Sequence, residues 1–265
     1  MILIFLGVIG ASFGSFAGAL VWRLHTKRNF VSDRSICENC HHQLGALDLV
    51  PIFSWLFLKG KCRYCHKSIS PKSLILEILT AGLFMVSYIF WPQPLADFTS
   101  VLPFVFWLAY VVGCVALAAY DLRWKLLPDK IVMPLIGLAA VDLLINRMLM
   151  QSQGLSAVTD VALGVVTISG FFALLFVVSK GRWIGFGDVK LGIFMGLVLG
   201  GAKSFIALLG SYYIAMAVIL PLLLLRKVGR SSHIPFGPFL LAAFFVSFLF
   251  GGGIIDWWHR LFLGA

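Results

Sequence analysis

The sequence contains few charged residues for its length. Only 12% of its 265 residues are Asp, Glu, Lys or Arg, whereas 60% belong to the apolar class AVILMFWYC. Soluble globular domains contain roughly 25% charged and 45–50% apolar residues, so this chain has too few charges to cover a surface that faces water. The composition excludes an ordinary soluble domain, a disordered chain and a coiled coil, and it predicts a protein embedded in lipid.

Long runs without charge support this prediction, because a helix needs about 20 residues to cross the hydrocarbon core. Eight runs are candidate spans: 1–22, 78–96, 98–120, 131–150, 161–179, 191–201, 204–225 and 234–255. The run 191–201 is short, and the run 131–150 contains Asp142 and Arg147. The first run lacks a basic leading region and an A-x-A-like cleavage site, so we expect a retained helix. The predicted fold is an all-α polytopic membrane protein with about eight transmembrane helices.

The basic residues indicate the orientation. If residue 1 lies outside, 18 of the 21 Lys and Arg residues fall on the cytoplasmic side, leaving Arg147, Lys203 and Arg260 outside. Positive residues are retained in the cytoplasm, so we expect a multi-pass protein of the cytoplasmic (inner) membrane with both termini outside. The net charge of +10 then reflects topology and contact with anionic headgroups, and we expect no nucleic-acid binding.

A polar segment, residues 24–72, separates the first two spans and carries four cysteines. Cys37, Cys40, Cys62 and Cys65 form two C-x2-C pairs separated by 21 residues, a spacing typical of a four-thiolate structural Zn²⁺ site. Two disulfides are the alternative, but stable disulfides are rare in the reducing cytosol. We therefore predict a small cytoplasmic zinc-binding domain. A segment of about 50 residues has too little apolar core to fold reliably without a bound metal. The neighbouring histidines could substitute as ligands, although we expect them at the surface: His41, His42 and His66.

Two acids near predicted span ends are candidates for catalysis. Asp121 follows the third run, and Asp188 lies in Gly185-Phe-Gly187-Asp188 before the sixth. Two carboxylates about 4 Å apart repel by roughly 4 kcal/mol at an effective dielectric of 20, so such a pair shares a proton. One member can then activate water while the other polarises a peptide carbonyl. The alternatives are that Asp121 pairs with Arg123 and that Asp188 caps a helix.

Motifs along nearly the whole chain resemble those of the bacterial prepilin peptidases, which are intramembrane aspartic proteases marked by G-x-G-D. The matching stretches are Gly10–Phe16 with Arg23, the paired cysteines, Asp48–Ser54, Gly60–Cys65, Ile69-Ser70 ending near Glu77, Asp121–Arg123 with Leu126–Asp129, Gly185–Lys190 and Ile234–Phe239. The resemblance implies that Asp121 and Asp188 are the catalytic pair and that Asp129 caps a helix start or supports the site.

The resemblance also implies a substrate and a second activity. Members of the family cleave the basic leader of prepilins and pseudopilins after a glycine, on the cytoplasmic side, and many methylate the new N-terminus with S-adenosylmethionine. The sequence has no glycine-rich nucleotide fingerprint after a strand. A site for that cofactor would be built from the cytoplasmic loop and neighbouring helix ends.

The expected domains are a first transmembrane helix (1–23), the tetracysteine domain (24–72), a seven-helix peptidase core (73–255) and a short C-terminal tail (256–265). Two other functions stay open. A transporter could use Asp142 as an ion site, and a non-catalytic scaffold could dock a secretion partner on its zinc loop. The sequence does not indicate the oligomeric state.

Overall fold

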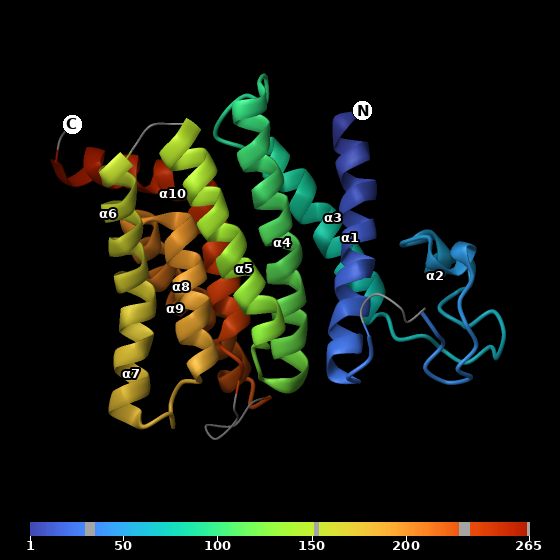
Figure 1. Cartoon of the computed structure of the whole chain (residues 1–265). Coiled ribbons are helices and arrows are strands. Elements are labelled where there is room, and N and C mark those ends of the chain that lie inside the picture. The colour runs from blue at the N-terminus through green and yellow to red at the C-terminus, as the bar shows by residue number, and fades with distance from the viewer. Residues whose placement is uncertain (30–34, 151–153, 228–233, 264–265) are drawn as a thin grey trace. The chain divides into compact units, whose positions relative to one another are not determined.

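The computed structural model describes residues 1–29, 35–150, 154–227 and 234–263, and these are mostly helical (Figure 1). Residues 30–34 of the expected tetracysteine domain and residues 264–265 of the expected tail lie outside the described part. Within that part there are isolated β-bridges but no β-strand. The predicted all-α fold is confirmed.

The chain divides into two compact units. The N-terminal unit contains Met1–Ile89 and Leu108–Ala119, and the C-terminal unit contains Phe90–Trp107 and Tyr120–Ala265. Helix α4 (Phe98–Trp124) contributes residues to both.

In the N-terminal unit, α1 (Ile2–His25) packs against α3 (Lys72–Ile89). Two glycines permit the close approach. A Cβ at Gly10 would lie 2.8 Å from the Cα of Ala81, and one at Gly14 would lie 2.7 Å from the Cα of Glu77. Helices in membranes associate closely where small residues recur four apart, as these glycines do. The crossing therefore fixes the backbone of Glu77 against α1.

The segment between α1 and α3 folds as a small domain with little regular structure. It contains a 3₁₀-helix, η1 (Ala46–Leu49), the short helix α2 (Phe53–Phe57) and two antiparallel bridges, Ile36 to Gln43 and Lys61 to Ser68. Each bridge closes the turn that carries one cysteine pair.

The C-terminal unit contains the remaining helices, which Figure 1 shows from green to red. They are α5 (Asp129–Asp142) with the π-helix η2 (Leu143–Met150), α6 (Gly154–Val165), the π-helix η3 (Val166–Gly170), α7 (Phe171–Ser179), α8 (Phe186–Leu199), α9 (Gly201–Leu224) and α10 (Gly237–Leu263). Helices α6, η3 and α7 are continuous.

Helix α8 lies among the other helices of this unit, since it contacts α5, α6, η3, α7, α9 and α10. Its glycines permit this packing. A Cβ at Gly196 would lie 2.5 Å from the Cα of Val165, and one at Gly192 would lie 2.9 Å from the Cα of Ser169. The second contact falls on Ser169 of η3, so α8 packs against the π-helical part of its neighbour. A helix covered in this way can be short.

Seven helices of the described residues are long and apolar enough to cross a membrane. Helix α8, with 14 residues, covers most of the sixth expected span (191–201) and is too short to count among them. The last helix differs from expectation, because α10 continues through the predicted tail to Leu263. The extension carries the exposed Trp257 and Trp258, and tryptophan is enriched where a membrane meets water.

Candidate active site and metal centre

Asp121 lies in the last turns of α4, where its side chain is buried. The C-cap residue of the helix is Lys125, which has a left-handed backbone (φ 54°) and whose N–H donates to the carbonyl of Asp121 at 2.8 Å. In the described residues Asp121 forms no ion pair with Arg123, whose guanidinium lies 5.4 Å from the ring centroid of Trp124. The alternative reading of Asp121 as one half of a helix-end ion pair is not supported.

Asp188 lies in the first turn of α8. Gly185 is the N-cap residue, so the alternative in which Asp188 is the cap is wrong. The carboxylate of Asp188 instead accepts the backbone N–H of Gly185, and its own N–H donates to the carbonyl of Gly185 at 3.2 Å. Asp188 is therefore fixed at the start of the most enclosed helix of its unit.

Both aspartates belong to the C-terminal unit, and they interact electrostatically. Leu127, between α4 and α5, fills the space beside them. A Cβ at Gly187 would lie 3.0 Å from the Cβ of Leu127, and one at Gly237 would lie 3.6 Å from its Cδ2. The three chain segments that carry Asp121, Asp188 and Gly237 therefore meet at one leucine.

Gly237 is the third element of this site, and the sequence patterns did not single it out. Its backbone N–H donates to the carboxylate of Asp121, and a Cβ on it would lie 2.5 Å from Oδ2 of that carboxylate. A glycine is needed here because the backbone approaches the acid directly. The only available signal was its position in the motif Ile234-Pro-Phe-Gly237-Pro.

Aromatic side chains lie beside the aspartates. Tyr212 of α9 interacts electrostatically with Asp188, and its ring centroid lies 5.3 Å from that of Phe236 and 6.3 Å from that of Phe171. Tyr212 is 41% exposed. Sequence reasoning missed it, since a tyrosine within an apolar run carries no distinguishing pattern.

The other two acids considered have partners of their own. Asp129 lies in the first turn of α5, and its Oδ1 accepts the ammonium of Lys190 at 2.7 Å, which ties α5 to α8. The N-cap residue of α5 is Pro128 rather than Asp129, and support of the site by Asp129 stays a prediction. Asp142 accepts a hydrogen bond from the buried amide of Asn146 one turn later.

The four cysteines of the N-terminal unit form one cluster. Their sulfur atoms all lie within 4.8 Å of one another, and Cys37 Sγ is 3.9 Å from Cys65 Sγ. Four sulfurs at about 2.3 Å from a tetrahedral zinc ion are separated by roughly 3.8 Å, so the cluster fits that metal. All four thiols are free, and the disulfide alternative is not formed.

The two halves of the cluster repeat the same turn. The N–H of Cys37 donates to the carbonyl of His42 and that of Cys62 to the carbonyl of Lys67, while His41 and His66 both have φ near 55°. Hydrogen bonding from the backbone N–H of Cys40 lowers the pKa of the Cys37 thiol, whereas burial and the neighbouring thiols raise that of Cys40, so the sulfurs are close enough to affect one another's ionisation. The three histidines are exposed and outside the cluster, as expected.

Comparison with known proteins identifies the family. Residues 8–91 match the bacterial peptidase A24 N-terminal domain, and residues 108–221 match the type IV leader peptidase family. A prepilin leader peptidase/N-methyltransferase of Aeromonas hydrophila is 32% identical over 235 residues, which is 89% of this chain and 78% of that protein. The chain belongs to the type IV leader peptidase family.

A second relative covers almost the full length of this family member. The prepilin leader peptidase/N-methyltransferase of Bacillus subtilis (strain 168) is 29% identical over 262 residues, 97% of this chain and 98% of that protein. No solved structure matches the chain. The four cysteines fall within the first matched region and both aspartates within the second. The two groups of residues that carry the resemblance in the sequence therefore each lie in a region that matches the family.

Proposed function

We propose that this protein is a membrane aspartic endopeptidase that removes the basic leader of type IV prepilins or pseudopilins after a glycine, with Asp121 and Asp188 as its catalytic pair. The proposal rests chiefly on one observation. Two carboxylates from α4 and α8 interact electrostatically, and a glycine backbone lies directly against one of them. Peptide hydrolysis by a carboxyl pair needs two carboxyl groups that influence each other's protonation, and this interaction supports the proposal.

In the proposed reaction the pair holds one proton. The ionised aspartate takes a proton from water, whose oxygen attacks the carbonyl carbon of the scissile peptide bond, while the protonated aspartate donates to the carbonyl oxygen. The tetrahedral intermediate then collapses. The C–N bond breaks as the protonated aspartate gives its proton to the amine nitrogen, while one hydroxyl of the intermediate gives its proton to the ionised aspartate as the carbonyl re-forms, so the pair again holds one proton.

The basic residues suggest how the substrate is oriented. Retention of Lys and Arg in the cytoplasm would place the zinc domain and the catalytic aspartates on the cytoplasmic side of the inner membrane. A basic leader would stay on that side while the apolar helix of the pilin lies in the bilayer. The scissile bond would then reach the depth of the aspartates.

We further propose that the enzyme methylates the new N-terminus with S-adenosylmethionine, the activity named in its relatives. The cofactor supplies a methyl group on a positively charged sulfur. When bound, it would give this methyl to the amine of the cleaved product, the carbon–sulfur bonding electrons would stay on sulfur, and the amine would release a proton.

We also propose that the chain is divided into four parts: 1–23, 24–72, 73–255 and 256–265. In this division Zn²⁺, held by the four cysteines, has the structural role of folding the second part.

The transporter and scaffold alternatives receive less support. Asp142, the candidate ion site, is hydrogen-bonded to Asn146 on its own helix. A scaffold would have no use for two interacting aspartates, of which Asp121 is buried and Asp188 half-buried.

Mass spectrometry of the product tests both activities together. Purified protein in lipid, given a prepilin with glycine before the cleavage point, should release the leader and yield a shortened chain with one added methyl group when S-adenosylmethionine is present. An intact substrate would contradict the peptidase assignment. A cleaved but unmethylated product would contradict the methyltransferase assignment alone.

A further inference from the structure

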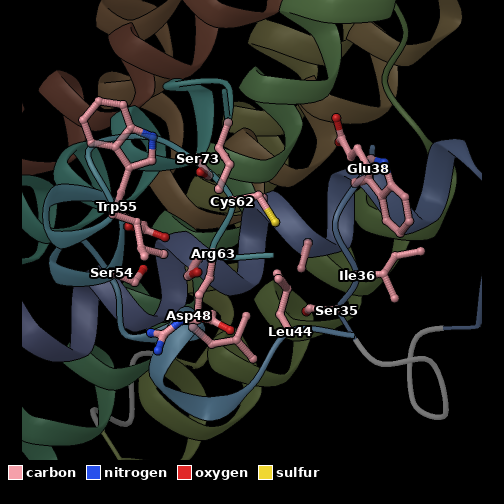
Figure 2. Close-up of a pocket in the computed structure, with 18 of the residues that line it drawn as sticks. Ser35, Ile36, Glu38, Leu44, Asp48, Ser54, Trp55, Cys62, Arg63 and Ser73 are labelled. Carbon is pink, nitrogen blue, oxygen red and sulfur yellow. The ribbon is translucent and has the colours of Figure 1, made fainter. Parts of the chain in front are cut away.

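A pocket of about 230 Å³ lies in the N-terminal unit beside the metal cluster, whose Cys62 forms part of its wall, and the peptidase mechanism does not use it. Its wall comes from three places: the end of α1, the small cysteine domain and the start of α3 (Figure 2). Residues with distinct chemistry line it: Trp22, Asp48, Trp55, Cys62, Arg63 and Glu77. Acidic, basic and aromatic groups therefore face one small space.

Glu77 is the most unusual of these residues. It is only 7% exposed, and its Oε2 accepts the backbone N–H of Ile52 at 2.7 Å. In the part of the chain that the structure describes, no hydrogen bond reaches its other oxygen and no cation pairs with it. A buried carboxylate without a counter-charge is costly, and a cationic ligand would remove that cost.

The backbone that binds Glu77 is in a strained conformation. Ile52 has φ 64°, a conformation that a β-branched residue rarely adopts, and its N–H is the donor to Glu77. On the other side, Gly14 brings α1 to within contact of the Glu77 backbone. Strained backbone that persists in a fold often marks a ligand site.

Trp55 contributes a second group without a partner. Its indole Nε1 is buried and has no acceptor among the described residues. Gly60, with φ 68°, packs its backbone against the indole, where a Cβ would lie 2.8 Å from Cζ2. Figure 2 shows the indole at the edge of the pocket. An aromatic surface with a donor suits a purine ring.

Asp48, in the same pocket, differs from Glu77 because its carboxylate has several hydrogen-bond donors and a counter-charge. Its carboxylate accepts Arg63 Nε at 2.7 Å, the N–H of Gly45 at 3.1 Å and the hydroxyl of Tyr64 at 3.4 Å. Asp48 therefore supports the domain. Its guanidinium partner Arg63 is 48% exposed and offers its terminal N–H groups to a carboxylate.

We propose that this pocket is the binding site of the sulfonium methyl donor, with Glu77 as the counter-charge to its cationic end, Arg63 as the group that binds its amino-acid carboxylate and Trp55 as the contact for its purine. The inference rests on the proposed N-methylation. It names residues for a site that lacks the usual nucleotide fold.

Calorimetric titration with two inert analogues tests the inference on the full-length protein. Sinefungin carries an amine in place of the sulfonium and is positively charged there, whereas S-adenosylhomocysteine is neutral. The wild type should bind sinefungin more tightly. Glu77→Gln should weaken sinefungin binding about tenfold or more, the size expected for one charged hydrogen bond, and weaken S-adenosylhomocysteine much less.

Trp55→Phe should weaken both analogues equally, because the contact that it removes is to the part they share. Asp256→Asn and Trp257→Phe, at exposed positions of α10, are the matched controls and should bind like the wild type. Zinc content and melting temperature report whether each variant folds. If Glu77→Gln folds and binds both analogues like the wild type, the assignment of the pocket is wrong even though methylation by the wild type stands. If the wild type methylates no substrate and binds neither analogue, the proposed methylation fails and the inference fails with it.

Discussion

The cysteine cluster and the aspartate pair are assembled by different means. The four thiols come from two short turns of the same shape, each closed by its own backbone hydrogen bonds and its own bridge. The two carboxylates come from α4 and α8, 67 positions apart in the sequence, and they meet only because helices pack around Leu127 and Gly237. We therefore expect the first site to depend on a bound metal for its stability and the second to depend on the packing of apolar helices.

The first way to test this contrast is to remove the metal. Replacing Cys37 and Cys40 by Ser should reduce bound zinc from about one equivalent per chain to near zero, because two thiolates cannot hold a structural ion. The small domain should then become sensitive to protease while the helical bundle stays folded. Metal analysis and limited proteolysis would measure both.

Cys114→Ser is the control for that experiment, since Cys114 lies in α4 outside the cluster. It should keep the zinc. A folded, reduced wild-type preparation without bound metal would refute the metal assignment.

A smaller effect is expected at the aspartate pair from Gly237→Ala. Its Cβ would lie 2.5 Å from Asp121 Oδ2, so the carboxylate must shift, and a shift of about 1 Å can cost roughly 100-fold in rate. Steady-state cleavage of a prepilin peptide would measure this loss at an unchanged melting temperature. Gly252→Ala in the same helix meets nothing within 4 Å and should be fully active. Equal activity of the two variants would mean that Gly237 does not position the acid.

The smallest effect is expected from Asp129→Asn. It removes the ion pair with Lys190, but the Asp129 side chain is 60% exposed. Exposed pairs contribute about 0–1 kcal/mol, so stability should fall by no more than that and cleavage should persist. Thermal unfolding and the same cleavage assay would show it. Complete loss of cleavage would move Asp129 into the catalytic machinery.

The sequence predicted those features that depend on local patterns. The cysteine cluster could be predicted because C-x2-C is a local turn, and the apolar helices because lipid demands long uncharged runs. Gly237 and Leu127 could not be predicted, since their roles arise from contacts between segments far apart in the chain. Glu77 stands at the end of a stretch that resembles the family's cytoplasmic loop, but its burial and its contacts could not be predicted. Its position at the start of an apolar helix looks ordinary until the crossing at Gly14 and the N–H of Ile52 are seen around it.

The central claim is that Asp121 and Asp188 perform the hydrolysis as a pair, and the rate of leader cleavage in single Asp→Asn variants tests it most directly. An amide has nearly the same shape as a carboxylate but can neither take a proton from water nor share one. Asp121→Asn and Asp188→Asn should each lower the rate by at least about 1,000-fold while the protein keeps its melting temperature and its zinc. Full cleavage activity in either variant would contradict the account.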